Sequence, residues 1–198
     1  MQIFPTISME YSGCEIMQIT MSDKIPDTTL CSLDIQDSVA TVTLSRSEVF
    51  NALNTQLITE LVEIFDWTST RSASINKSIN DENGVPFLRV LVLNSEGKHF
   101  CAGADVNMMR DAGAATPQEN RDDSKRLDSL FNSLWSHPCF TICCVQGVAL
   151  GGGAGLVSCV DHVIGEPRTR IALSEGKLGI LPAVIGPYVY RKIGSSQF

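Results

Sequence analysis

The feature that most constrains the fold is a pair of short, almost uninterrupted apolar runs that lie far apart in the chain. Residues 87–93 (FLRVLVL) are apolar at every position except Arg89, and residues 140–146 (FTICCVQ) form a second run of this kind. Such runs are typical of strands that are buried on both faces, as in a parallel sheet covered by helices. We therefore expect the centre of a sheet at residues 87–93.

The segments around these runs alternate between strand and helix patterns. Asn54 is a suitable N-cap for one helix, and Thr116, Pro117 and Glu119 mark the start of another. The predicted elements, in chain order, are strands within residues 33–44, a helix from 55 to about 67, a surface loop over 70–84, the strand at 87–93, a helix over 117–135, the strand at 140–146, a helix over 154–160 and a strand over 162–164. This alternation predicts an α/β domain.

The chain is long enough for one substantial core, because 43% of its 198 residues are hydrophobic. We divide it into a peripheral N-terminal segment, residues 1–30, and a core domain, residues 31–198. The formal net charge of −7 and the even scatter of Lys and Arg leave no basic stripe, which argues against nucleic acid as a partner. No apolar run approaches the ~20 residues that a membrane-spanning helix needs, so we expect no membrane partner.

The cysteine and histidine pattern predicts free thiols and no metal. The seven cysteines lie mostly in apolar surroundings, and together with the three histidines they show no CxxC or HExxH spacing. Residues 153–158 imitate the GxGxxG fingerprint, but Ser158 takes the third glycine position and the preceding strand ends near Gly147. We therefore expect neither a metal nor a dinucleotide cofactor.

Two glycine-rich segments, each placed after a predicted buried strand, are the candidates for chemistry. They are residues 97–105 (GKHFCAGAD) and residues 146–155 (QGVALGGGAG). A glycine-rich turn ahead of a helix exposes backbone N–H groups, which attract a phosphate, a carboxylate or a developing oxyanion. One such cluster alone is better explained by close packing of a helix on a strand, but two of them can converge on one oxygen.

Three blocks around these segments, FCAGADVNMM, VQGVALGGGAGLVSCVDHVI and ALSEGKLGILPAVIGPYVYRKIG, resemble in order and spacing the signature of the crotonase (enoyl-CoA hydratase/isomerase) family. The resemblance spans residues 33–194 and is greatest to methylglutaconyl-CoA hydratases. It implies a crotonase-like spiral of ββα units and an oxyanion hole of two backbone N–H groups, which map onto Ala102 and Gly152. The substrate contacts that it implies are Ala52, Ala102, Gly103, Ala104, Asp105, Gly151 and Gly152.

The same resemblance makes Glu175 the expected general acid/base, because Ser174 and Glu175 match the family position whose glutamate handles the proton at the reacting carbons. Well-known hydratases carry a second glutamate two positions after the third glycine, where this chain has Gly155. We expect hydration of an enoyl-CoA, closest to 3-methylglutaconyl-CoA, as in leucine degradation or fatty acid metabolism. An enoyl-CoA isomerase with a single glutamate, or an inactive homologue that binds CoA thioesters, are the open alternatives.

A further departure concerns the coenzyme A end of the site. Where the family often reads Arg-Pro-Lys before Asn-Ala-Leu, this chain has Glu48 in place of the lysine. Arg46 and Lys98 are the expected replacements as partners of the CoA phosphates.

The resemblance also carries expectations about the whole molecule. The substrate brings coenzyme A with it, so no separate cofactor is expected, and relatives form homo-oligomers. Relatives continue with helices that close the pocket, so the chain is expected to lack a C-terminal helical region beyond Phe198. The family favours mitochondria, but residues 1–30 hold a single basic residue, Lys24, and no visible targeting segment, which leaves the cytoplasm open.

Overall fold

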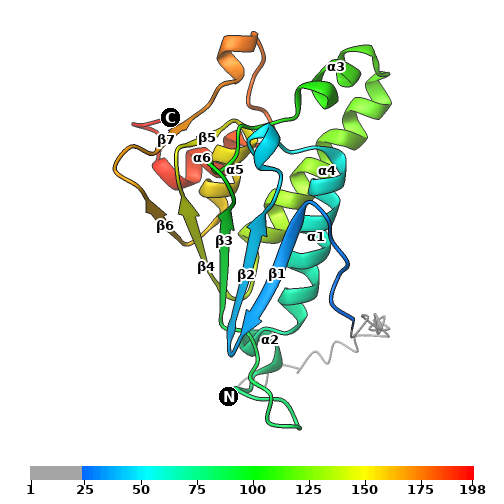
Figure 1. The fold of residues 1–198 in the computed structure, drawn as a ribbon. Helices are drawn as coiled ribbons and strands as arrows, with labels where there is room; N and C mark the ends of the chain where they lie inside the picture. Colours follow the sequence, from blue (N-terminus) through cyan, green and yellow to red (C-terminus); the bar gives the residue numbers. More distant parts are fainter. Residues whose placement is uncertain (1–23) are drawn as a thin grey trace, which may run out of the picture.

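The computed structural model describes residues 24–198 and is built around a five-stranded sheet (Figure 1). Across the sheet the strands follow chain order: β1 (Cys31–Gln36), β2 (Val39–Leu44), β3 (Val90–Ser95), β4 (Phe140–Val145) and β6 (His162–Gly165). β1 and β2 form an antiparallel hairpin, whereas β2, β3, β4 and β6 are parallel neighbours. The predicted central position of the first apolar run, residues 87–93, is therefore confirmed, because β3 lies third of five.

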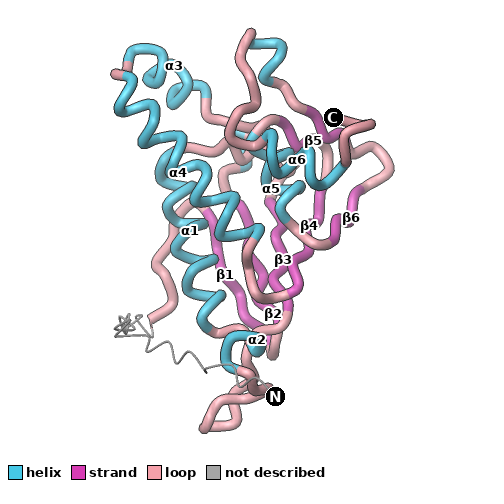
Figure 2. The backbone as a smooth tube through the Cα atoms, turned by 180° about the vertical axis from the view of Figure 1, so that it is seen from behind, coloured by secondary structure: helices cyan, strands magenta, loops and turns pink. Residues whose placement is uncertain are grey.

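Four helices lie on one face of this sheet (Figure 2). They are α1 (Thr55–Thr70), α4 (Pro117–Trp135), α5 (Gly152–Cys159) and α6 (Gly186–Ile193). α1 begins where the Asn54 side chain accepts a hydrogen bond from the Leu57 N–H at 2.8 Å. α4 begins with the predicted capping box, in which Thr116 and Glu119 each bond to the other's backbone N–H.

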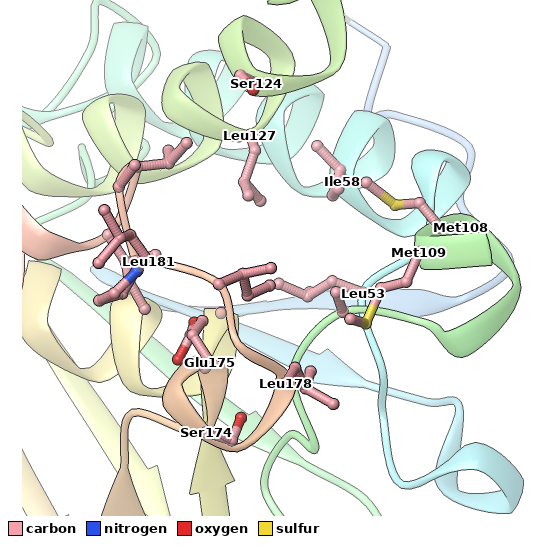
Figure 3. Close-up of a pocket in the computed structure, with 18 residues that line it drawn as sticks. Leu53, Ile58, Met108, Met109, Ser124, Leu127, Ser174, Glu175, Leu178 and Leu181 are labelled. Carbon is pink, nitrogen blue, oxygen red and sulfur yellow. The ribbon is translucent and has the colours of Figure 1, made fainter. Parts of the chain in front are cut away.

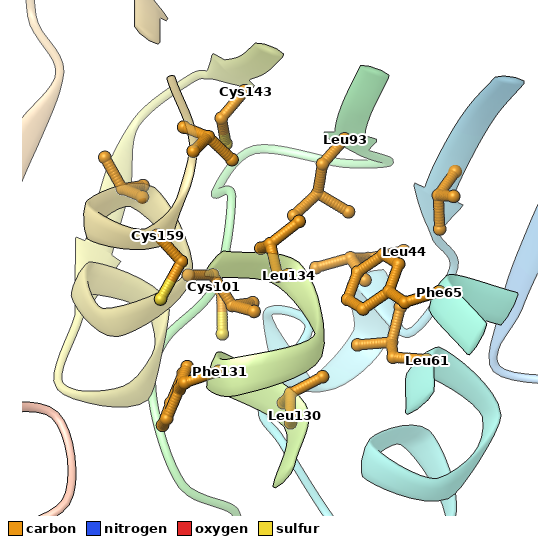
Figure 4. Close-up of a cluster of buried hydrophobic side chains, with 14 of the residues drawn as sticks. Leu44, Leu61, Phe65, Leu93, Cys101, Leu130, Phe131, Leu134, Cys143 and Cys159 are labelled. Atoms are coloured by element: carbon orange, nitrogen blue, oxygen red, sulfur yellow. The ribbon is translucent and has the colours of Figure 1, made fainter. Parts of the chain in front are cut away.

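The core lies between the sheet and these helices. The register sets Val42, Leu93 and Cys143 side by side on neighbouring strands, and all three are fully buried. Figure 4 shows Phe65 of α1 and Phe131 of α4 in this cluster, both with no exposed surface. Each such side chain contributes roughly 1.5–3 kcal/mol through burial of apolar surface, so this layer holds the helices on the sheet.

Shorter elements connect the layers. They are the 3-10 turns η1 (Ser47–Val49) and η2 (Glu175–Leu178), the helices α2 (Ala73–Asn76) and α3 (Val106–Ala114), and a small parallel sheet of β5 (Val148–Leu150) and β7 (Arg170–Ala172). α3, α6, β5 and β7 were not predicted, and the predicted loop over 70–84 contains α2. β3 begins three residues later than predicted, because the Leu88 N–H bonds to Arg71 O, beside α2, instead of to the sheet.

The segment that directly precedes β1 is held in place by α1. Glu60 of α1 accepts hydrogen bonds from the backbone N–H groups of Thr29 and Leu30, at 3.1 and 2.8 Å. Most of the predicted peripheral segment, residues 1–23, lies outside the described residues. Within residues 24–198, no helix is long and apolar enough to cross a membrane.

Candidate active site

A cavity of about 280 Å³ lies beyond the carboxyl ends of the parallel strands, between α3, α4 and the segment after β7 (Figures 1 and 3). Open α/β sheets usually bind their ligands at this end. The apolar lining consists of Leu53, Ile58, Ala104, Met108, Met109, Leu127, Leu178, Ile180, Leu181, Pro182, Ala183, Val184 and Ile185. Among the described residues, polar side chains reach it only from Ser124, Ser174 and Glu175, and the backbone of Gly151 and Gly152 completes the wall.

Glu175 is the one ionisable residue among the described residues that line this cavity (Figure 3). Its Oε2 atom is buried and has no hydrogen-bond partner within residues 24–198. Its Oε1 atom lies so close to Gly151 that a Cβ added there would be 3.0 Å away. A buried carboxylate oxygen without a partner is costly to desolvate, and a catalytic role is one reason for a protein to keep it. The predicted acid/base thus lies in a pocket of the right kind.

Ala104, which lines the cavity, has a free backbone N–H. The Leu53 N–H donates to Gly103 O at 2.8 Å, and the Asp105 N–H donates to Leu53 O at 2.9 Å. In this parallel bridge the intervening N–H of Ala104 points away from Leu53. Among residues 24–198 it has no acceptor, and Ala104 lines the cavity.

Gly152 supplies a second free N–H, because it is the first residue of α5. Gly151 turns the chain from β5 into α5 with φ +48°, a conformation that glycine adopts at little cost. A Cβ added at Gly152 would lie 2.8 Å from Leu53 Cδ1, so glycine lets this backbone approach the cavity wall. No described residue accepts a hydrogen bond from the Gly152 N–H.

The prediction that Ala102 supplies an oxyanion donor is wrong. Its N–H donates to Phe50 O at 2.9 Å, and the residue does not line the cavity. Our mapping of the family motif onto this chain placed the donor two residues too early. The sequence does not show that the Ala102 N–H is already bonded to Phe50 O. Ala104, predicted only as a substrate contact, has the free N–H instead.

Three other predicted substrate contacts, Ala52, Gly103 and Asp105, do not line the cavity and form its frame. The C=O of Ala52 accepts a hydrogen bond from Arg46. Gly103 has φ +97°, and a Cβ there would be 2.9 Å from a carbonyl of β5. Asp105 caps α3 by accepting from the Asn107 N–H at 2.9 Å. Ala104, Gly151, Gly152 and Glu175 are therefore the predicted site residues that the structure brings together.

Arg46 is turned inward and is not available to a CoA phosphate. Its Nη2 atom lies 3.0 Å from Asp105 Oδ2, and only 12% of its side chain is exposed. Burial alone would raise the pKa of Asp105, but the hydrogen bonds from the Asn107 N–H and from Arg46 outweigh it and hold the pKa below its usual value. Lys98, the other expected phosphate partner, is exposed.

Cysteine chemistry has no support at this site. Cys101 is fully buried, and burial raises the pKa of its thiol to about 12, so the thiol stays protonated at neutral pH. The described cysteines, which are Cys31, Cys101, Cys139, Cys143, Cys144 and Cys159, are all free. Within residues 24–198, no three His, Cys, Asp or Glu residues group together as metal ligands would.

The apolar lining could not be predicted from the sequence. Met108 and Met109 come from α3, and the segment 178–185 approaches from the opposite side, as Figure 3 shows for Leu178 and Leu181. The one available signal was the helical spacing of Leu127 in α4, and it indicated a core position, not a pocket wall.

A family model described as enoyl-CoA hydratase/isomerase matches residues 34–198. An enoyl-CoA hydratase of Alternaria alternata is 29% identical over 161 residues, which cover 81% of this chain and 47% of that protein. A mevalonyl-coenzyme A hydratase of Beauveria bassiana is 30% identical over 171 residues, or 82% of this chain and 55% of that protein. The chain thus spans about half the length of the curated relatives that it matches.

Solved structures show the same likeness in three dimensions. An enoyl-CoA hydratase from Shewanella pealeana superposes with a TM-score of 0.76 at 34% sequence identity. The match covers 87% of this chain and 60% of that one.

Proposed function

Because the chain belongs to the enoyl-CoA hydratase/isomerase family, we propose that it binds the carbonyl oxygen of an acyl-CoA thioester at the N–H groups of Ala104 and Gly152, with the reacting carbons beside Glu175. The crotonase-like α/β fold that the sequence predicted is confirmed by the likeness to solved family members. The observation that carries the proposal is the buried, unpartnered Glu175 Oε2 in an apolar cavity that two free N–H groups also line.

The two N–H groups suit an oxygen that gains negative charge. Proton transfer at the carbons next to a thioester moves electrons onto the carbonyl oxygen, and donors already aimed at it stabilise the resulting enolate. One such donor is commonly worth roughly 3 kcal/mol of barrier. The apolar lining strengthens these hydrogen bonds, because it lowers the local dielectric constant.

In the hydration reaction, Glu175 would act first as base and then as acid. It accepts a proton from water as the water oxygen bonds to the β carbon, and the electrons of the double bond move onto the thioester oxygen. The enolate then collapses, and Glu175 returns the proton to the α carbon. One carboxylate can perform both transfers because it lies on the same side of the substrate in each.

The packing around Gly155 supports isomerisation as a second candidate reaction. A Cβ added at Gly155 would lie 2.7 Å from Ile185 Cγ2 and 2.8 Å from Phe131 Cε1, so the position of the second family glutamate is filled by apolar side chains. Glu175 is therefore the one carboxylate among the described lining residues that is available for proton transfer. A 1,3-proton shift needs only one: Glu175 removes a proton from the α carbon and delivers it to the γ carbon.

The acyl group that the sequence suggested, 3-methylglutaconyl, carries a carboxylate of its own. No Lys, Arg or His is found among the described residues that line the cavity, so this carboxylate would have no cationic partner there and would repel Glu175. We therefore expect uncharged acyl groups such as crotonyl to react faster than 3-methylglutaconyl.

An absorbance assay tests the proposal, because the conjugated enoyl thioester absorbs in the ultraviolet. Loss of absorbance with crotonyl-CoA or 3-methylglutaconyl-CoA reports hydration, and gain with the β,γ-unsaturated vinylacetyl-CoA reports isomerisation. Glu175→Gln is expected to lower either rate by at least about 10²-fold, the range of general acid–base catalysis. Glu82→Gln, at an exposed loop position, is the matched control and should keep the wild-type rate. A folded chain that binds the thioesters without changing their absorbance would contradict the proposal and leave a binding protein.

A further inference from the structure

An ion pair beside the cavity fixes the loop that carries Ala104, although it has no part in the chemistry described above. Arg46 Nη2 lies 3.0 Å from Asp105 Oδ2, and the side chains of the two residues are 12% and 11% exposed. Through Nη1 the same guanidinium donates to the C=O of Ala52. A planar guanidinium with two acceptors fixes both in one geometry, which a lysine ammonium does not. Arg46 therefore joins two segments that are far apart in the chain.

Both acceptors of Arg46 neighbour the residues that set the direction of the Ala104 N–H. Ala52 directly precedes Leu53, and Asp105 directly follows Ala104. Leu53 bonds to the peptide groups on either side of Ala104, as 2.8 and 2.9 Å hydrogen bonds. A shift of Ala52 or Asp105 would therefore rotate the Ala104 peptide and turn its N–H away from the cavity.

The start of the segment before Leu53 is anchored by Asn51, which bonds to the backbone of Arg46 and not to its side chain. Asn51 is fully buried and donates from Nδ2 to the C=O groups of Glu96 and His99, both at 2.9 Å. On the other side, Asp105 caps α3 through its second oxygen, at 2.9 Å from the Asn107 N–H. Removal of the ion pair should therefore leave the loop and α3 in place and loosen only the peptide between them.

We propose that Arg46 and Asp105 are positioning residues for the oxyanion donor Ala104, an inference that rests on the proposed function. Neither side chain lines the cavity, so we expect their effect to pass through the Ala104 peptide and not through contact with the acyl group. An oxyanion hole stabilises the transition state only when its donors are already aimed at the oxygen, and a misplacement of about 1 Å can cost about 10²-fold in rate.

The test is the paired variant Arg46→Met with Asp105→Asn, which removes both charges and leaves neither buried alone. Asparagine keeps the cap of α3, because its side-chain oxygen accepts the same N–H. We expect kcat to fall by about 10- to 100-fold while KM changes by less than about 3-fold, the pattern of an interaction made in the transition state. The bound state gives a second readout: carbonyl polarisation shifts the absorbance of enzyme-bound cinnamoyl-CoA to longer wavelength, and this shift should shrink in the variant.

The matched control is a second Arg–Asp pair on the exposed surface of α4. Arg126 and Asp123 are 2.9 Å apart with 41% and 34% side-chain exposure, so Arg126→Met with Asp123→Asn should keep both kcat and the absorbance shift. A folded site variant with wild-type kcat and wild-type shift would overturn the positioning role. If the paired variant does not fold, Asp105→Asn alone is measured with the same readouts and the same criteria. A wild-type chain with neither turnover nor shift would instead refute the proposed function, and the positioning role with it.

Discussion

Gly155 shows how a single missing side chain shapes the site. Ile185 and Phe131 occupy the space that a side chain at this position would need. The loss of the second carboxylate is therefore built into the packing of α5, α4 and the segment before α6. A glutamate introduced at this position alone would clash with Ile185 and Phe131, so it would not restore the second carboxylate without further changes.

Gly155→Ala is expected to destabilise the protein. The new methyl group would lie 2.7 Å from Ile185 Cγ2 and 2.8 Å from Phe131 Cε1, and overpacking of this kind typically costs about 1–3 kcal/mol. The midpoint of urea unfolding measures this cost. Gly113→Ala in α3 is the control, because nothing lies within 4 Å of a Cβ there, and the change should leave stability equal or higher by about 0.5–1 kcal/mol. Equal midpoints for both variants would show that the Gly155 contact is loose.

His137 links the end of α1 to the start of the strand β4. Its Nδ1 accepts a hydrogen bond from the Cys139 N–H at 3.2 Å, so its Nε2–H faces Thr68 Oγ1 at 3.0 Å. Burial lowers the pKa of His137 from an ordinary 6.5 to about 4, although Phe65 O and the charge of Asp161 act in the opposite direction. Protonation of Nδ1 would remove the acceptor of the Cys139 N–H, so the connection between the two elements requires the neutral ring.

This connection should make stability fall in mild acid. In the unfolded chain His137 is protonated below its ordinary pKa of 6.5, whereas in the folded chain it is protonated only below about pH 4. The stabilisation is therefore complete above pH 6.5 and is lost as the pH falls toward 4, by about 2–3 kcal/mol. Urea unfolding between pH 7 and 4 measures this loss, and His137→Gln should reduce it. His162→Gln, on the exposed start of β6, should keep the wild-type slope, and identical slopes in all three proteins would contradict the assignment.

On the scale of the whole molecule, the apolar residues that cover one side of the cavity are largely exposed to solvent. Leu178, Ile180 and Leu181 are 57%, 50% and 84% exposed, and they lie over an apolar cavity. We expect the folded protein to bind the fluorescent dye anilinonaphthalene sulfonate here, and butyryl-CoA, which lacks a double bond, to displace it. Leu181→Ser should weaken dye binding, whereas Ile75→Ser on the remote α2, also exposed, should not. Dye fluorescence that butyryl-CoA leaves unchanged would place the dye elsewhere.

Most of the architecture could be predicted from the sequence, and part of the site could not. Hydrophobic periodicity and caps locate α1, α4 and the parallel strands, because these signals are local. Motif spacing leads to Glu175 and Gly152, which both line the cavity. It fails at Ala102 and Ala104, because the free N–H is decided by hydrogen bonds to Phe50 and Leu53, which are tertiary contacts. The apolar lining is missed for the same reason, since the segment 178–185 has no periodic pattern.

The agreement between strand order and chain order has a consequence for how the molecule is made. Because β1, β2, β3, β4 and β6 follow one another in both, each strand that leaves the ribosome finds its neighbour already synthesised, at the growing edge of the sheet. The sheet can therefore be assembled in one direction, without waiting for a later strand to be inserted between two earlier ones. The cavity is completed last, because Glu175 and the segment 178–185 emerge only after all five strands. A nascent chain would thus acquire its scaffold well before it acquires the ability to hold a substrate.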